Sequence, residues 1–278
     1  MNFEQLIENI RSLDLNLYDF ALYTDDGVHA CKIRPSNNCN DSYSVAKLFI
    51  TTALGMLWDK GRLDLDAPVC SFFPEYTPAD PRWQKVTIDH ALTHRIGFDA
   101  GFLDIDVEDV NAYPTDDYLE MVFSHPIAYE PGTHRQYSDA AFYLLARLAG
   151  RLAGEGVDSF LWKHLLKPMQ FKEVAWSRCP HEHPIGATGL YISSGDMVKL
   201  GALYLNDGIW NGQRLLSEEW VHLAIDRKYE LHTLDDTDFI GKRGMYEQGV
   251  AFSKERGIAI AFHAFEKRSI LAALKDLL

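Results

Sequence analysis

The chain has 278 residues, of which 47% are hydrophobic, 24% charged and 12% aromatic. This length and composition suffice for a globular protein with a sizeable hydrophobic core. With 40 acidic against 27 basic residues the net charge is −13. An excess of negative charge opposes binding to nucleic acid or to anionic membranes, so we expect neither as a partner.

No segment has the features of an export signal or a membrane span. The first residues, MNFEQLIENIRSLDL, carry acidic side chains where a signal peptide carries lysines, and no run of about 18 apolar residues follows. These features predict a cytoplasmic protein. The four cysteines, Cys31, Cys39, Cys70 and Cys179, are widely scattered, which is typical of free thiols in a reducing compartment.

The start of the chain predicts a helix and a hairpin. Residues 5–13 have amphipathic spacing, and residues 17–23 alternate in the manner of a strand. The turn sequence at residues 25–27 separates this strand from a second one at residues 28–33.

From about residue 42 to residue 200 helical patterns and loops prevail, including an apolar helix over 140–156. Two strands, 247–252 and 257–264, flank a short turn near the end, and the tail RSILAALKDLL predicts a final helix.

Strands at both ends of the chain suggest one antiparallel sheet with an inserted helical region, which is an α+β fold. We expect a single domain with two subdomains. The sheet subdomain would comprise about 1–60 and 187–278, and the helical subdomain about 61–186.

The stretch DSYSVAKLFI places Ser44 and Lys47 three residues apart at the start of an apolar helix. On a helix this spacing puts both side chains on one side, about 5–6 Å apart at Cβ. A neutral lysine can take the proton of a serine hydroxyl, and burial near a helix N-terminus favours the neutral form. The same pattern also fits a lysine that merely extends to solvent. Ser42 or Asp41 stands where an N-cap belongs, and we interpret Ser42 as structural.

Two later stretches supply companions for this motif. Tyr137-Ser138-Asp139 precedes the helix over 140–156, and Lys242-Arg243-Gly244 leads into the late strands. In this order the three motifs resemble those of the serine β-lactamase and penicillin-binding-protein superfamily, in particular its class C and esterase-like branch. Further blocks, such as KGRLDLDAPV and VTIDHALTHRIGF, extend the resemblance over nearly the whole chain.

The resemblance implies the same α+β fold, with an active-site cleft between the two subdomains. It also implies roles for three catalytic residues. Ser44 resembles the acylated nucleophile, Lys47 its proton partner, and Tyr137 the tyrosine that moves the proton to the leaving group.

The third motif supplies the substrate-binding residues that the resemblance implies. Lys242 resembles the cation at the sheet edge that holds the charge of the tyrosine and a substrate carboxylate, and Gly244 completes the motif. The backbone N–H groups of Ser44 and Met245 match the oxyanion hole.

Two substitutions depart from the family pattern and touch substrate binding. Asp139 occupies the position of an asparagine, and a carboxylate cannot donate a hydrogen bond to a substrate carbonyl. It would also raise the pKa of Lys47 and weaken it as a base. Arg243 replaces a small hydroxyl residue, and its guanidinium could clamp a substrate carboxylate or simply lie in solvent.

No cofactor or metal is expected. The segment over 179–183 holds four potential metal ligands, but they are crowded and lack a second ligand pair. The resemblance also implies no metal. The expected partner is a small acyl substrate, and the oligomeric state is left open.

These motifs predict a serine hydrolase that forms an acyl-enzyme on Ser44 and acts on a small ester, amide or β-lactam. The alternative is a binding or sensor protein that retains the penicillin-binding fold without turnover. Asp139 and Arg243 are the residues that keep this alternative open.

Overall fold

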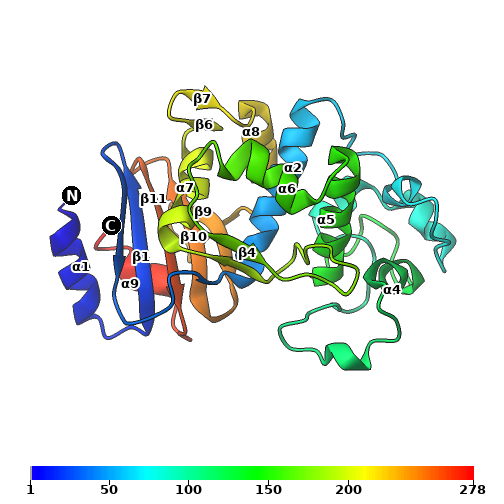
Figure 1. The fold of residues 1–278 in the computed structure, drawn as a ribbon, viewed down its shortest axis with the longest axis horizontal. Coiled ribbons are helices and arrows are strands. Elements are labelled where there is room, and N and C mark those ends of the chain that lie inside the picture. The colour runs from blue at the N-terminus through cyan, green and yellow to red at the C-terminus, as the bar shows by residue number, and fades with distance from the viewer. Residues whose placement is uncertain (1) are drawn as a thin grey trace.

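A computed structural model describes residues 2–278. Its main feature is a six-stranded sheet with the order β2-β1-β11-β10-β9-β8, in which all neighbours are antiparallel (Figure 1). The strands are β1 Leu17–Thr24, β2 Gly27–Lys32, β8 His232–Thr233, β9 Ile240–Gly244, β10 Gln248–Ser253 and β11 Ile258–Ala264. Because β1 pairs with β11, the sheet joins both ends of the chain, and the predicted α+β fold is confirmed.

Helices cover both faces of this sheet. The terminal helices α1 (Phe3–Ser12) and α9 (Ile270–Leu274) share one hydrophobic cluster with the sheet (Figure 1). On the other face lies α7 (Ser194–Leu205), which contacts β1, β10 and β11. The sheet is therefore buried on both sides, as the nearly continuous burial along β10 and β11 requires.

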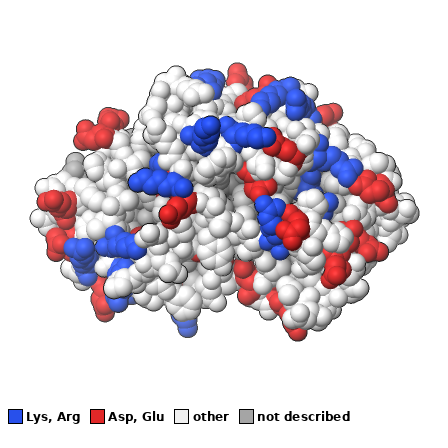
Figure 2. Space-filling view, viewed as in Figure 1, with Lys and Arg blue, Asp and Glu red and all other residues white. Residues whose placement is uncertain are grey.

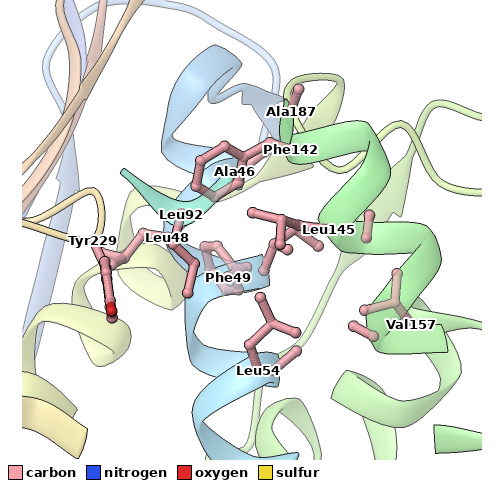
Figure 3. Close-up of a cluster of buried hydrophobic side chains, with 14 of the residues drawn as sticks. Ala46, Leu48, Phe49, Leu54, Leu92, Phe142, Leu145, Val157, Ala187 and Tyr229 are labelled. Atoms are coloured by element: carbon pink, nitrogen blue, oxygen red, sulfur yellow. The ribbon is translucent and has the colours of Figure 1, made fainter. Parts of the chain in front are cut away.

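The middle of the chain forms the helical part, in which α2 (Ala46–Asp59) is central. It packs against α5 (Asp139–Ala153), α6 (Val157–Leu161) and α8 (Glu218–Asp226). Figure 3 shows α2 side chains such as Phe49 directed toward Leu145 of α5. A helix that is apolar nearly all round is typical of one enclosed by the protein.

The remaining elements are short. Two further helices are α3 (Ile88–Leu92) and α4 (Tyr118–Ser124). A three-stranded sheet is formed by β3 Asn40–Asp41, β5 Leu190–Ile192 and β4 Val174–Trp176, and a two-stranded one by β6 Ile209–Trp210 and β7 Gln213–Arg214.

The start of α2 differs from the expectation. The helix begins at Ala46, and Ser44 lies in the preceding 3-10 turn, Tyr43–Val45. Ser42 occupies the expected N-cap position, but its side chain does not cap the helix. Its buried hydroxyl instead donates to the carbonyl oxygen of Leu190 at 2.8 Å. Asp41 instead accepts a hydrogen bond from the backbone N–H of Tyr43 at 2.8 Å. Ser42 is structural, but it ties the turn to β5.

The four cysteines are free thiols, as the sequence predicts. Among residues 2–278, no helix combines the length and the apolar character that crossing a membrane requires.

The core around α2 allows a test of the packing. Phe49 is 1% exposed, so Phe49→Ala should lower the free energy of unfolding by about 3–5 kcal/mol through lost contacts and a residual cavity. Val107→Ala is the control, because Val107 is 67% exposed and its truncation should change stability by less than about 0.5 kcal/mol. Urea denaturation measures both, and equal losses would contradict the central position of α2.

Candidate active site

Ser44 lies in the turn before α2 and remains half-buried. The preceding residue, Tyr43, has a φ of 47°, a left-handed conformation that non-glycine residues rarely adopt. Two of the predicted catalytic side chains reach the Ser44 hydroxyl. The Lys47 ammonium donates to Ser44 Oγ at 3.0 Å, and the hydroxyl oxygen of Tyr137 lies 2.8 Å from it. The structure thus brings together Ser44, Lys47 and Tyr137.

Lys47 is fully buried and has three acceptors around its Nζ. They are Ser44 Oγ at 3.0 Å, the carbonyl oxygen of Ala187 at 2.9 Å and Asp139 Oδ1 at 2.7 Å. An ammonium has three N–H donors, so each acceptor is satisfied only if Lys47 is protonated. Burial alone would lower the pKa of Lys47, but nearby negative charge, most of all that of Asp139 together with Tyr137 and Glu230, raises the pKa.

Two cations lie close to the ring of Tyr137. The Nζ atoms of Lys47 and Lys242 are 4.8 and 5.1 Å from the centroid of its ring. The ring of His94 packs against it with centroids 4.5 Å apart. Negative charge on the Tyr137 oxygen is therefore stabilised by two ammonium groups, while His94 restricts the position of the ring.

His94 belongs to a buried polar chain. Its Nδ1 accepts from the backbone N–H of Ser138 at 3.3 Å, which leaves the ring proton on Nε2 to donate to Glu230 Oε1 at 2.7 Å. Burial lowers the pKa of His94, in agreement with this neutral form. The other oxygen of Glu230 forms an ion pair with Lys242.

Glu230 is the residue of the site that sequence reasoning missed. Burial by itself would raise the pKa of Glu230, but the charge of Lys242 and the hydrogen bond from His94 hold it well below its usual value. Glu230 lies outside all three motifs and follows no local pattern, so only the fold reveals it. His94 has a structural, hydrogen-bonding role, because both of its ring nitrogens are engaged within this chain.

The third motif lies where β9 ends against the turn that carries Ser44. A Cβ atom on Gly244 would fall 2.4 Å from the carbonyl oxygen of Ser42 and 3.1 Å from the backbone nitrogen of Ser44. Only glycine permits this close approach of two backbone segments. Met245 follows directly, in the turn Met245–Glu247, so the backbone expected to form the oxyanion hole lies at this junction.

Arg243 is not part of this cluster, which corrects the expectation that it could clamp a substrate. Lys242 and Arg243 are consecutive in β9, so their side chains point to opposite faces of the sheet. The guanidinium of Arg243 pairs with Asp235 Oδ1 at 3.0 Å and with Glu247 Oε1 at 3.4 Å. It also donates to the hydroxyl of Ser269, the N-cap of α9, at 3.2 Å. Its role is to link β9 with the terminal helix.

One group of carboxylates adjoins Lys47. Oxygen atoms of Asp104, Asp106 and Asp139 lie within 4.8 Å of one another. Asp139 is paired with the Lys47 ammonium, and Asp106 accepts a hydrogen bond from Thr188 at 2.6 Å. The positive charge beside Asp139 makes this group unsuited to hold a metal ion.

A family model described as Beta-lactamase matches residues 36–268 and includes all three motifs. The chain belongs to the Beta-lactamase family. Curated relatives in this family are hydrolases of several kinds. The chain is 31% identical over 134 residues to an esterase, EstB, of Burkholderia gladioli. The aligned region covers 42% of this chain and 34% of the esterase.

A penicillin-binding protein of Bacillus subtilis is 26% identical over 146 residues, which covers 52% of this chain and 35% of that protein. Penicillin-binding protein 4 of Amycolatopsis lactamdurans is 27% identical over 231 residues and 72% of this chain. The alignments with the esterase and the Bacillus protein span about a third of the length of those relatives.

Solved structures confirm the β-lactamase-like fold at low sequence identity. A protein described as a 6-aminohexanoate-dimer hydrolase of Bacillus anthracis superposes with a TM-score of 0.80 at 13% identity, covering 100% of this chain and 80% of that one. An octameric penicillin-binding protein homologue of Pyrococcus abyssi gives a TM-score of 0.75 at 18% identity, covering 100% and 78%.

The contact at Gly244 gives a prediction for the site. Gly244→Ala should displace β9 from the Ser44 turn and slow the labelling of Ser44 by a fluorophosphonate about 100-fold, the scale expected for a shift of about 1 Å. Gly61→Ala is the control. Gly61 has a φ of 66° but no atom within 4 Å of an added Cβ, so this variant should lose stability and keep its labelling rate. Equal labelling of both variants would contradict the role of the contact.

Proposed function

We propose that this chain is a serine hydrolase that forms an acyl-enzyme on Ser44. The observation that carries the proposal is that Ser44 Oγ lies within hydrogen-bond distance of both the Lys47 ammonium, at 3.0 Å, and the Tyr137 hydroxyl, at 2.8 Å. A serine hydroxyl becomes a nucleophile when a neighbouring group removes its proton, and Ser44 has two ionisable neighbours for this purpose.

The contacts support different roles for the two neighbours. Lys47 uses all three of its N–H donors and is held in the charged form by Asp139. A charged lysine cannot accept a proton, so Tyr137, as the phenolate, is the general base. Lys47 and Lys242 stabilise the phenolate, and Lys47 also stabilises the oxygen of Ser44 as it loses its proton.

The reaction then proceeds in two halves. The Ser44 proton passes to the Tyr137 oxygen while Oγ bonds to the substrate carbonyl carbon. The resulting oxyanion is held by the backbone N–H groups of Ser44 and Met245. Tyr137 returns the proton to the leaving group as the acyl–leaving group bond breaks. In the second half water attacks the acyl carbon, its proton passes through Tyr137 to Ser44, and the acid is released.

The names of the relatives support the substrate class that we propose. The relatives are named as an esterase, a β-lactamase, penicillin-binding proteins and an amidase, all of which bear on acyl substrates. We therefore propose a small ester, amide or β-lactam as the substrate. A panel of p-nitrophenyl esters, nitrocefin and D-alanyl amides distinguishes these three.

The nucleophile is tested by covalent labelling. A fluorophosphonate or a fluorescent penicillin should add its mass to Ser44, and Ser44→Ala should show no adduct because the reacting oxygen is gone. Intact-mass spectrometry followed by peptide mapping measures both. If the folded wild-type protein gains no mass with any of these probes, the proposal is refuted.

The lifetime of the adduct separates an enzyme from a binding protein. An acyl-enzyme formed from a p-nitrophenyl ester should decay with release of the acid and regeneration of free Ser44. A stable adduct without turnover would instead identify the chain as a penicillin-binding sensor.

The assignment of the base is tested by two substitutions. Tyr137→Phe should lower kcat/KM by about 10²–10⁴-fold, because Lys47 cannot replace the lost base. Adding Asp139→Asn removes the negative charge that raises the pKa of Lys47. Lys47 then loses its proton at a lower pH, so the double variant should recover activity that increases as the pH is raised above neutral.

A matched control is available in α7. Asp196 Oδ1 lies 2.7 Å from Lys199 Nζ, in another buried lysine–aspartate pair. Asp196→Asn should cause a comparable loss of stability without changing the pH–rate profile. Full activity in Tyr137→Phe would show that a different group is the base.

The single variant Asp139→Asn should raise turnover of amides or β-lactams. An unchanged rate would show that this carboxylate does not limit the turnover of these substrates.

A further inference from the structure

One edge of the main sheet lacks the features that usually protect such an edge. In the order β2-β1-β11-β10-β9-β8 the outer strands are β2 and β8, and β8 has only two residues. β2 (Gly27–Lys32) has six residues, and its register with β1 runs without a shift along the whole strand. Short strands, β-bulges and prolines commonly prevent an edge from pairing further, and β2 has none of these features.

The backbone of β2 presents free hydrogen-bonding groups along this edge. The N–H of Ile33 donates to the carbonyl oxygen of Tyr18 at 2.8 Å, so every second residue of β2 bonds to β1. The N–H groups of Val28, Ala30 and Lys32 therefore point away from β1, and within residues 2–278 no further strand pairs with them. Together with the carbonyl groups of Val28 and Ala30, they can bond to one more strand.

There is also room for the side chains of such a strand. On one face of β2 lies α1, since the rings of Phe3 and His29 are 5.4 Å apart. On the other face a cavity of about 500 Å³ is lined by Val28 and Ala30 of β2 and by Gly195 of α7, among others. A strand added to the sheet lies about 4.8 Å from its neighbour, so its alternate side chains would point toward this cavity.

The charges at the two ends of β2 are opposite in sign. The exposed Asp25 and Asp26 form the turn before the strand, and the exposed Lys32 is its last residue. On the face shown in Figure 2, Asp and Glu residues gather at the tip of the β1–β2 hairpin, and Lys and Arg residues gather lower on this side of the molecule. Two such strands are complementary when they run antiparallel, because each acidic end then meets the basic end of the other strand.

We propose that β2 pairs antiparallel with β2 of a second copy of this chain, so that two sheets join into one continuous sheet. In the register that places Lys32 opposite the partner's Asp26, Val28 lies opposite the partner's Ala30, and the outward N–H groups of each strand meet carbonyl groups of the other. A two-fold axis makes each contact occur twice and closes the assembly at a dimer. This interface does not depend on the proposed function.

Sedimentation equilibrium tests whether the dimer forms. Over about 1–100 µM, a range that covers weak to moderate association, the measured mass should rise from 31.6 kDa toward twice that value. A mass that stays at 31.6 kDa over the whole range would overturn the proposal.

Ala30→Pro tests the strand pairing. Proline removes the outward N–H of Ala30, which makes no bond to β1, so circular dichroism should show a folded monomer. The dissociation constant of the dimer should rise at least about tenfold, because both copies lose a donor at the interface. Ala30→Ser is the matched control, since it keeps the N–H and should keep the dimer.

Charge reversal gives a second test that leaves the backbone unchanged. Lys32→Asp would face the partner's Asp26 with a like charge, and Asp26→Lys would face the partner's Lys32 in the same way. Either single variant should raise the dissociation constant about tenfold, and the double variant should return it to the wild-type value. Arg62→Glu is the control, because it reverses an exposed charge beyond the end of α2 and should change nothing.

Two further outcomes would contradict the proposal. If the chain is dimeric but both Ala30→Pro and the charge reversals leave the dissociation constant unchanged, another surface forms the dimer. If the double variant associates as weakly as the single variants, the two strands do not pair in this antiparallel register.

Discussion

The buried ammonium of Lys47 is the constraint on which the site depends. A charge without solvent contact must be compensated, and removing its partner typically costs about 3–5 kcal/mol. Lys47 therefore requires Asp139 from the start of α5 and the carbonyl oxygen of Ala187, as well as Ser44. One side chain thus joins three segments that are far apart in the sequence, and the geometry around Ser44 follows from satisfying it.

Residues at the end of β9 complete the site around the Lys47 ammonium. Gly244 lets β9 approach the Ser44 turn, and Lys242 from the same strand faces Tyr137. Behind Tyr137, the chain from His94 to Glu230 compensates Lys242 in turn. Tyr137 therefore lies close to two lysines, each of which is paired with its own carboxylate. The Tyr137 hydroxyl itself contacts Ser44, and within residues 2–278 it has no hydrogen bond to a carboxylate.

The aspartate at position 139 explains how this site differs from the pattern that the family motifs suggest. An asparagine would leave Lys47 without a negative partner, and burial would then favour its neutral form. Asp139 does the opposite, and the proposed proton transfer shifts to Tyr137.

The distribution of charge over the whole molecule is also uneven. The chain is strongly acidic, yet a cleft that Lys242 helps to line is surrounded by Lys and Arg side chains. The net charge of the chain therefore does not indicate the charge next to the site.

The sequence by itself determined the elements and the order of the motifs. Alternation and helical spacing are local properties, so the hairpin at the start, the late pair of strands and the apolar helix after Ser44 were predictable, as was a sheet from both ends. Spacing paired Ser44 with Lys47, and the resemblance of the three motifs to the family implied that Tyr137 joins them.

Only the tertiary structure decided how these groups are charged and which others join them. Two of the three acceptors around Lys47 come from distant segments, and Glu230 reaches the site from a loop without any motif. The orientation of Arg243 depended on the face of β9 to which its position belongs. The protonation states of these side chains and the directions in which they point are set by burial and by neighbours in space. No local pattern in the sequence determines either of them.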